Sequence, residues 1–131
     1  MYTRIRKFRI TTRDGKTVLE ETIDTKTISM GDLDSLIELF RIISSESRYR
    51  IMRFLSEREA SSFKEICEAL GYSQKTIAQS LDDLVRIHAV RRSPEGYMLS
   101  TVGKLLISQL KELAAILRKI REFEDLVMEF E

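Results

Sequence analysis

The sequence predicts a mainly helical α+β fold with a small amount of β structure. Apolar residues recur at helical spacing over most of the chain after residue 31. Short β-like segments occur in only two places, around Asp14-Gly15 and around Pro94. The 131 residues, 43% of them hydrophobic, suffice for one compact core with an extension.

Residues 2–12 and 17–24 are predicted to form an N-terminal β-hairpin. They flank Asp14-Gly15, a dipeptide that favours a two-residue hairpin turn. Such a turn sets chemically compatible side chains opposite each other, because it pairs Arg9 with Glu20 and Ile10 with Leu19. Residues 1–16 also carry six basic side chains against one Asp. Two interpretations stay open: an auxiliary arm that contacts DNA, or a solvated sheet edge protected by charge.

Two helices are predicted next. The first begins at Asp32, an acidic residue at the helix N-terminus, and has an apolar stripe of Leu33, Leu36, Ile37, Phe40 and Ile43. The second begins after Ser45-Glu46-Ser47 and is expected to bury Ile51, Met52 and Leu55.

A third and a fourth helix follow, separated by a glycine. The third spans about Ser62 to Leu70, directs Phe63, Ile66 and Leu70 to the core, and ends at Gly71, a residue that favours the C-terminal cap. Ser73 is expected to cap the fourth helix, whose inward positions are Ile77, Leu81, Leu84 and Val85.

The segment Ser93-Pro94-Glu95-Gly96 favours a type I turn, which predicts a small hairpin between Val90 and Leu99. Thr101 is then expected to cap a last helix that extends to Glu131. A helix of that length is about 45 Å long at 1.5 Å per residue, and its apolar stripe needs a partner. We therefore predict a homodimer with an interface on this helix, formed by Leu106, Leu110, Leu113, Leu117, Ile120, Phe123 and Val127.

The order of these segments over residues 47–100 predicts a winged helix-turn-helix. In this fold one recognition helix, here about residues 73–88, lies in the major groove of DNA, and the wing, residues 90–99, lies on the flanking backbone or in a minor groove. The predicted division is residues 1–31 for the hairpin extension, 32–100 for the DNA-binding domain and 101–131 for the dimerisation helix.

The candidate DNA-binding residues share side chains suited to phosphates or base edges. Lys, Arg and hydroxyl groups suit phosphates, Gln can bond adenine with two hydrogen bonds, and Ala can contact a thymine methyl group. The same residue types are common on any exposed helix face, so each one alone has this second interpretation. They are Ser73, Gln74, Lys75, Thr76, Ala78 and Gln79 on the helix, Arg91 and Arg92 on the wing, and Arg48 and Arg50 on the second helix.

Composition and motifs argue against several other classes of protein. The chain has no phosphate-binding glycine loop, no nucleophile with a histidine partner and no cluster of metal ligands, so an enzyme is not expected. No apolar run reaches the roughly 20 residues of a membrane span, and no signal peptide is evident, which predicts a cytoplasmic protein. The absence of Asn, with 33% charged residues, is a bias that thermophile proteins often have.

Three segments, Ser47–Leu55, Leu70–Leu81 and Leu84–Val90, resemble the ArsR-like winged-helix transcriptional regulators, and Tyr97–Gly103 is similar to the wing-to-helix junction of archaeal winged-helix regulators. The resemblance extends over about residues 33–115. It implies a helical core, a recognition helix that starts at Ser73-Gln74, and a dimer made by the terminal helices.

The chain departs from the metal-sensing members of that family. Those members have two cysteines on the third helix, where this chain has Ser62 and Lys64, which supply no thiolate. Cys67 is expected to pack as a small apolar residue. The terminal-helix metal site of other members needs histidines, and residues 101–131 contain none, while His88 is expected to cap or pack. No metal and no cofactor is therefore expected, and a small-molecule effector is left open.

These observations predict a sequence-specific regulator that binds double-stranded DNA as a homodimer. Two alternatives stay open: a winged-helix protein-interaction subunit of transcription or chromosome machinery, and a nucleoid protein that binds without sequence preference. The net charge of +1 argues mildly against the nucleoid protein, because nonspecific affinity depends on many phosphate contacts.

Overall fold

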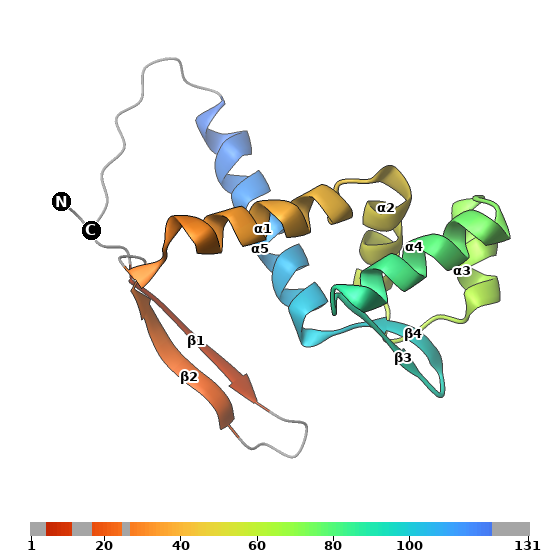
Figure 1. Ribbon diagram of the computed structural model, residues 1–131, viewed down its shortest axis with the longest axis horizontal. Helices are drawn as coiled ribbons and strands as arrows, with labels where there is room; N and C mark the ends of the chain where they lie inside the picture. Colours follow the sequence, from red (N-terminus) through yellow and green to blue (C-terminus); the bar gives the residue numbers. More distant parts are fainter. Residues whose placement is uncertain (1–4, 12–16, 25–26, 122–131) are drawn as a thin grey trace. The chain divides into compact units, whose positions relative to one another are not determined.

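The computed structural model describes residues 5–11, 17–24 and 27–121, in two compact units, one containing the N-terminal hairpin and the other residues 36–122. The elements, in chain order, are β1 (Ile5–Thr11), β2 (Thr17–Asp24), α1 (Met30–Ile43), α2 (Glu46–Ser56), α3 (Phe63–Leu70), α4 (Gln74–Arg86), β3 (Val90–Ser93), β4 (Gly96–Leu99) and α5 (Thr101–Ile120) (Figure 1). This mostly helical architecture with two small hairpins confirms the predicted fold class. The limits predicted for the three domains stay a prediction.

The hairpin of β1 and β2 has the predicted register. Arg9 lies opposite Glu20 and Ile10 opposite Leu19, and the register shifts after Ile10. The predicted turn at Asp14-Gly15 lies outside the described residues.

Helix α1 begins at Met30, two residues earlier than expected, because Ser29 caps it. The Ser29 N–H donates to the Asp32 carboxylate at 2.9 Å, and the Asp32 N–H donates to the Ser29 hydroxyl at 3.1 Å. This reciprocal pair satisfies two N–H groups that the helix itself leaves without acceptors. Of the predicted stripe, Ile43 is buried, whereas Leu33, Leu36 and Ile37 are exposed.

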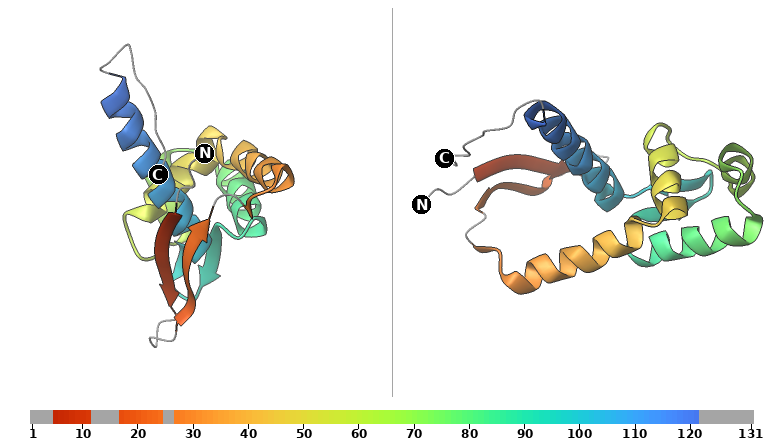
Figure 2. Two further views of the ribbon diagram at one scale, coloured as in Figure 1. Left: turned by 90° about the vertical axis from the view of Figure 1, so that its left-hand side faces the viewer. Right: turned by 90° about the horizontal axis from the view of Figure 1, so that it is seen from above.

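The core lies between α2, α3 and α4, and β3, β4 and the start of α5 add to it (Figure 2). Its fully buried side chains include most of the residues predicted for α2, α3 and α4, namely Ile51, Met52, Leu55, Ile66, Ile77, Leu81 and Leu84. The other three predicted residues, Phe63, Leu70 and Val85, are partly buried against this core. Helix α3 starts with a capping box between Ser62 and Glu65 and ends at Gly71, whose φ of 75° lies in the left-handed region. The predicted ends of α3 are therefore confirmed.

The hairpin of β3 and β4 has a two-residue turn at Pro94 and Glu95, as the sequence indicates. Ser61 extends it, because Ser61 and Tyr97 exchange two backbone hydrogen bonds of 2.9 and 2.8 Å. Gly96 has a φ of 123°, and a Cβ atom there would lie 2.4 Å from the Ser61 carbonyl oxygen. This position therefore requires glycine, and the segment before α3 holds β4 close to its turn.

Helix α5 is capped by Ser100 rather than by Thr101, which is the first residue of the helix. The Ser100 hydroxyl accepts a hydrogen bond from the Gly103 N–H at 3.0 Å. The helix is described as far as Ile120. The rest of the predicted helix, with Phe123 and Val127, lies outside the described residues.

Candidate nucleic-acid interface

Helix α4 packs one side on the core and leaves the opposite side exposed. Ile77, Leu81 and Leu84 are buried, whereas Lys75, Gln79, Asp82 and Arg86 are exposed. The exposed residues are spaced by three or four positions, so they form one row along the helix. Gln74 and Ala78 are also exposed beside this row. The face therefore combines amide, cationic, carboxylate and methyl groups.

The N-terminus of α4 is well defined. Ser73 accepts a hydrogen bond from the Thr76 N–H at 3.1 Å and donates its hydroxyl proton to Thr76 Oγ1 at 3.0 Å. The remaining N–H groups of the first turn, with the positive end of the helix dipole, favour an anion at this position. Lys75 is exposed in the same turn.

The C-terminus of α4 comes earlier than expected. The helix ends at Arg86, and His88 adopts a left-handed conformation with a φ of 65°. Its N–H donates to the Val85 carbonyl at 3.0 Å, while its side chain is exposed. The backbone of His88, rather than its imidazole, therefore closes the helix and turns the chain into β3. Of the two roles expected for His88, capping or packing, the structure favours a cap, made by the backbone of this residue.

Asp83 of α4 is the centre of a polar cluster that links α4 to α2. Its carboxylate accepts from Arg48 Nη1 at 3.1 Å, from Arg86 Nη2 at 2.7 Å and from Gln79 Nε2 at 3.3 Å. The side chain of Asp83 is only 10% exposed, and that of Arg48 only 25%. Arg48 Nε also donates to the Ile42 carbonyl. Beside this cluster the hydroxyls of Ser47 and Ser80 are hydrogen-bonded at 2.8 Å.

The two arginines predicted on α2 are both engaged within the chain. Arg48 is hydrogen-bonded to the Asp83 carboxylate and to the Ile42 carbonyl, so its guanidinium is not available to DNA. Arg50 Nη2 lies 3.2 Å from Glu46 Oε1, one turn earlier on the same exposed helix face. A contact of this kind between exposed side chains is weak and leaves the cation accessible.

The two arginines of the wing differ in their surroundings. Arg92 Nη2 lies 2.8 Å from Asp82 Oδ1 of α4, and its guanidinium lies 5.9 Å from the Tyr97 ring centre. Arg91 is exposed and has no ion pair with the described residues. The ion pair of Arg92 ties the wing to α4, and Arg91 stays available beside it.

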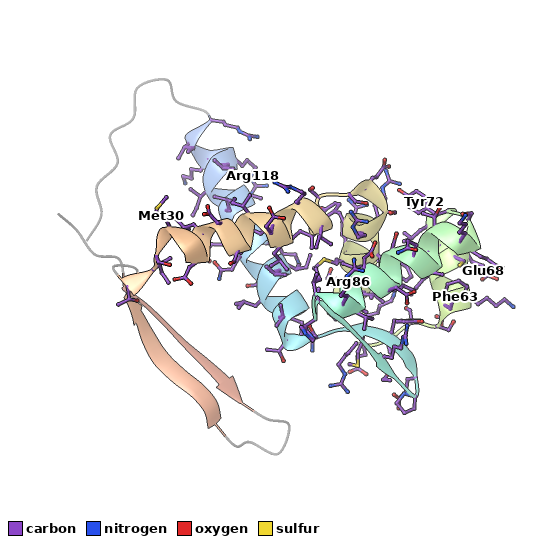
Figure 3. All side chains as sticks on the ribbon, in the orientation of Figure 1. Met30, Phe63, Glu68, Tyr72, Arg86 and Arg118 are labelled. Carbon is purple, nitrogen blue, oxygen red and sulfur yellow. The ribbon has the colours of Figure 1, made fainter. Side chains whose placement is uncertain are left out.

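Two residues of this part of α4 were not predicted from the sequence: Asp83, which is buried beside the exposed row, and Arg86. Figure 3 labels Arg86 on α4. The spacing of Gln79, Asp83 and Arg86 at i, i+4 and i+7 was the available signal, because residues three and four apart are neighbours on a helix. The partners Arg48 and Arg92 come from other elements, which no local spacing indicates.

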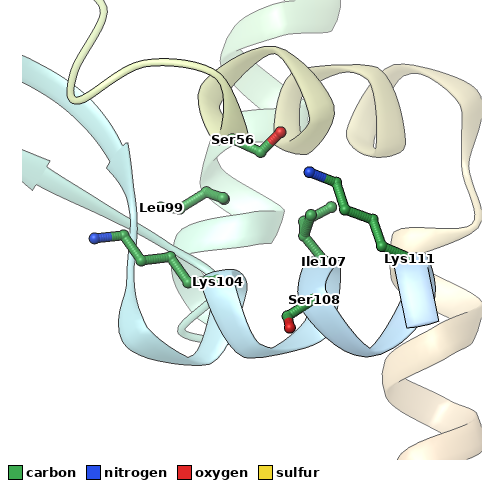
Figure 4. A pocket seen from close by; sticks show the side chains of 6 residues that line it. All are labelled: Ser56, Leu99, Lys104, Ile107, Ser108 and Lys111. Carbon is green, nitrogen blue, oxygen red and sulfur yellow. The ribbon is translucent and has the colours of Figure 1, made fainter.

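A separate pocket lies between α2, β4 and α5, with a volume of about 300 Å³ (Figure 4). Leu99 and Ile107 supply apolar lining, and Lys104 and Lys111 supply cations. No residue of α4 lines it, so it is not part of the candidate interface.

The described residues contain no group of three or more His, Cys, Asp or Glu side chains placed to hold a metal ion. Cys67 is partly buried and packs against the core, as expected. Within the same part of the chain, no helix is long and apolar enough to cross a membrane.

Comparison with solved structures establishes the class of protein. The quinone-bound YodB from B. subtilis is 25% identical, with a TM-score of 0.59, over 66% of this chain and 99% of that one. HlyU from Vibrio cholerae N16961 is 26% identical, with a TM-score of 0.54, over 67% of this chain and 99% of that one. The fold is that of winged-helix transcription regulators.

The family is also defined. Residues 34–125, more than half of the chain, match the family described as the N-terminal domain of methanogenesis regulatory protein FilR1. No curated protein matches the chain at a significant level. The chain thus belongs to the FilR1 N-terminal domain family and is a transcription regulator of the winged-helix type.

Proposed function

We propose that this protein is an ArsR-like, sequence-specific regulator that binds double-stranded DNA as a homodimer in the cytoplasm and has no catalytic activity. The observation that carries the proposal is the exposed row of α4, which is flanked by its capped N-terminus and by Arg91 of the wing. A protruding helix with polar and cationic groups, set beside a basic hairpin, is the arrangement by which winged helices bind DNA.

In this proposal the first turn of α4 contacts phosphates. The Thr76 hydroxyl and the free N–H groups supply donors, Lys75 supplies a positive charge, and Ser73 holds the turn in place through its two hydrogen bonds to Thr76. Gln74, Ala78 and Gln79 then lie over base edges in the major groove, and Arg86 extends the same row toward the far end of the helix. Arg91 contacts the flanking backbone or a minor groove.

The homodimer is proposed from apolar surface that a single chain leaves uncovered. Leu36 and Ile37 of α1 are 39% and 54% exposed, and Leu113, Ile116 and Ile120 of α5 are 52%, 43% and 40% exposed. Leu113, Ile116 and Ile120 are three and four positions apart and so share one face of α5, and an exposed apolar face of this kind marks an interaction site. A two-fold axis would then place two α4 helices in successive major grooves about 34 Å apart.

The predicted dimer residues do not all have the same surroundings. Leu106 is buried in the core of its own chain and Leu110 packs partly against that core, whereas Leu113 is exposed and Leu117 is half-buried. The proposed interface on α5 therefore begins after Leu110. Ile116, which the sequence-based set omitted, joins it.

Selection from a pool of random duplexes at physiological salt, with sedimentation of the protein alone, tests the proposal. We expect an enriched palindrome and a dimer at micromolar concentration. A monomer at that concentration would contradict the dimer. Tight binding without enrichment would indicate the nucleoid protein, and an absence of binding would indicate the protein-interaction subunit.

Two substitutions separate the proposed contacts. Gln79→Ala should cost about 1–3 kcal/mol on the selected site and relax its specificity, with little change on random DNA. Arg91→Ala should weaken binding to all sequences and reduce the salt slope by about one unit. Lys119→Ala, on the C-terminal part of α5, is the matched control for loss of a charge. An equal loss with all three variants would contradict the assigned roles.

A further inference from the structure

We propose that Asp83 determines DNA specificity by fixing the orientation of the Gln79 side-chain amide, although Asp83 itself does not reach the DNA. This inference rests on the proposed function and deepens it. Asp83 follows Gln79 by one helical turn, its side chain is 10% exposed, and Gln79 is exposed. Asp83 therefore lies beside the row that would face the groove rather than in it.

The Asp83 carboxylate is held from two sides. Arg48 of α2 binds Oδ2 at 3.1 Å, and Arg86 of α4 binds Oδ1 at 2.7 Å. Arg48 is in turn anchored to the Ile42 carbonyl. The position of the carboxylate is thus set by two helices, and it is defined before any ligand binds.

This fixed carboxylate selects one of the two orientations of the Gln79 amide. Gln79 Nε2 lies 3.3 Å from Asp83 Oδ1. An ionised carboxylate only accepts hydrogen bonds, so the amide nitrogen of Gln79 must face it and the amide oxygen must face away. One N–H of Gln79 is then used, while the oxygen and the second N–H stay available.

The available groups match one base better than another. Adenine presents a donor at N6 and an acceptor at N7 in the major groove, so it needs one acceptor and one donor from glutamine. Guanine presents two acceptors at O6 and N7, which the fixed amide oxygen would oppose. A glutamine free to rotate could offer its NH₂ group to guanine. Asp83 thereby favours adenine at the base pair that Gln79 contacts.

The test uses the full chain and the site found by selection. The base pair that Gln79 contacts is identified as the one where Gln79→Ala relaxes specificity. Fluorescence anisotropy then gives the Kd for two duplexes, one with adenine and one with guanine at that position. A bidentate pair is expected to discriminate by about tenfold or more. Asp83→Asn, which can donate to the amide oxygen and so permits the reversed orientation, should reduce this ratio severalfold at that pair alone. In the Gln79→Ala background it should have no further effect.

An unchanged ratio in Asp83→Asn, or an equal loss at every base pair of the site, would overturn the role of Asp83 and leave the proposed function intact. Absence of any preferred site would overturn both.

A second measurement keeps the test valid if Asp83→Asn does not fold. In the NMR spectrum of the free wild-type chain, the side-chain amide protons of Gln79 should exchange with water more slowly than those of Gln74. Gln74 is exposed on the same helix, and its side chain makes no hydrogen bond with the described residues, which makes it the internal control. Equal exchange rates for the two amides would contradict the fixed orientation.

Discussion

Gly103→Ala is expected to destabilise the domain, because the start of α5 lies directly against the segment that follows α4. A Cβ atom at Gly103 would lie 2.1 Å from the Ala89 carbonyl oxygen and 3.0 Å from Leu99 Cδ2. The carbonyl cannot turn away freely, since it accepts a hydrogen bond from the Ser100 N–H at 3.0 Å. Helix α5 would have to move by on the order of 1 Å to restore ordinary contact.

The size of the effect follows from two destabilising contributions and one stabilising contribution to the free energy of unfolding. Overpacking of a core costs about 1–3 kcal/mol, and loss of the Ser100–Ala89 hydrogen bond costs about 0.5–1.5 kcal/mol. Alanine is favoured over glycine inside a helix by about 1 kcal/mol, which offsets part of this. The net loss in the free energy of unfolding is therefore on the order of 2 kcal/mol.

Urea unfolding followed by circular dichroism, at one protein concentration, measures this loss. With a urea dependence of about 1–3 kcal/mol per molar, the midpoint should fall by on the order of 1 M. Gly31→Ala is the control, because its Cβ atom would meet only the Ser29 hydroxyl at 3.6 Å, an ordinary contact. It should leave stability equal or slightly higher. An unchanged or higher midpoint for Gly103→Ala would refute the reasoning about this contact.

Three further substitutions test other parts of the structure. Hydrogen bonds from the Ser62 backbone and then from its side chain hold the pKa of Glu65 below its ordinary value of 4.5. The free energy of unfolding of the wild type should therefore fall as the pH drops below about 4.5, and that of Glu65→Gln should fall less over the same range. Identical acid unfolding curves for the two proteins would argue against the capping box. Arg48→Met removes one of the two cations that bind the Asp83 carboxylate, and it should lower the free energy of unfolding by about 2–3 kcal/mol in thermal unfolding. This loss is smaller than that for a fully buried pair because both side chains are partly solvated. An unchanged stability would show that the ion pair is dispensable. Ile116→Asp should convert the proposed dimer to a monomer in sedimentation, and Lys119→Asp should not; a dimer that survives Ile116→Asp would move the interface elsewhere.

Local rules predicted most of the secondary structure. The predicted start of α3 near Ser62 is correct, and the structure adds a capping box between Ser62 and Glu65 there. Gly71 predicts the end of the same helix, because glycine adopts a positive φ at little cost. The two starts that were misjudged, at Ser29 and Ser100, lie beside equally plausible capping residues, and only the hydrogen bonds decide between them.

The candidate interface was predicted less completely than the fold. The helical periodicity of apolar residues correctly assigned Ile77, Leu81 and Leu84 to the buried side of α4. The residues on the opposite side of the helix were therefore expected to be exposed. Arg48, at the start of α2, and Arg91, on the wing, were predicted to be in the same interface because both side chains are basic. The two are distinguished by Asp83, 35 residues from Arg48 in the sequence, which binds only one of them.

By itself, the sequence determined the order of the elements, the caps at Gly71 and Ser73, the register of the N-terminal strands and the buried face of α4, because these depend on interactions between residues that are close in the sequence. The tertiary structure decided which charges are paired and which apolar residues stay exposed. Arg92 forms an ion pair with Asp82 because the wing packs beside α4. Leu106 is buried and Leu113 is exposed because only the first part of α5 packs against the core. A helical pattern specifies a face, but the neighbour that covers the face depends on how distant segments pack.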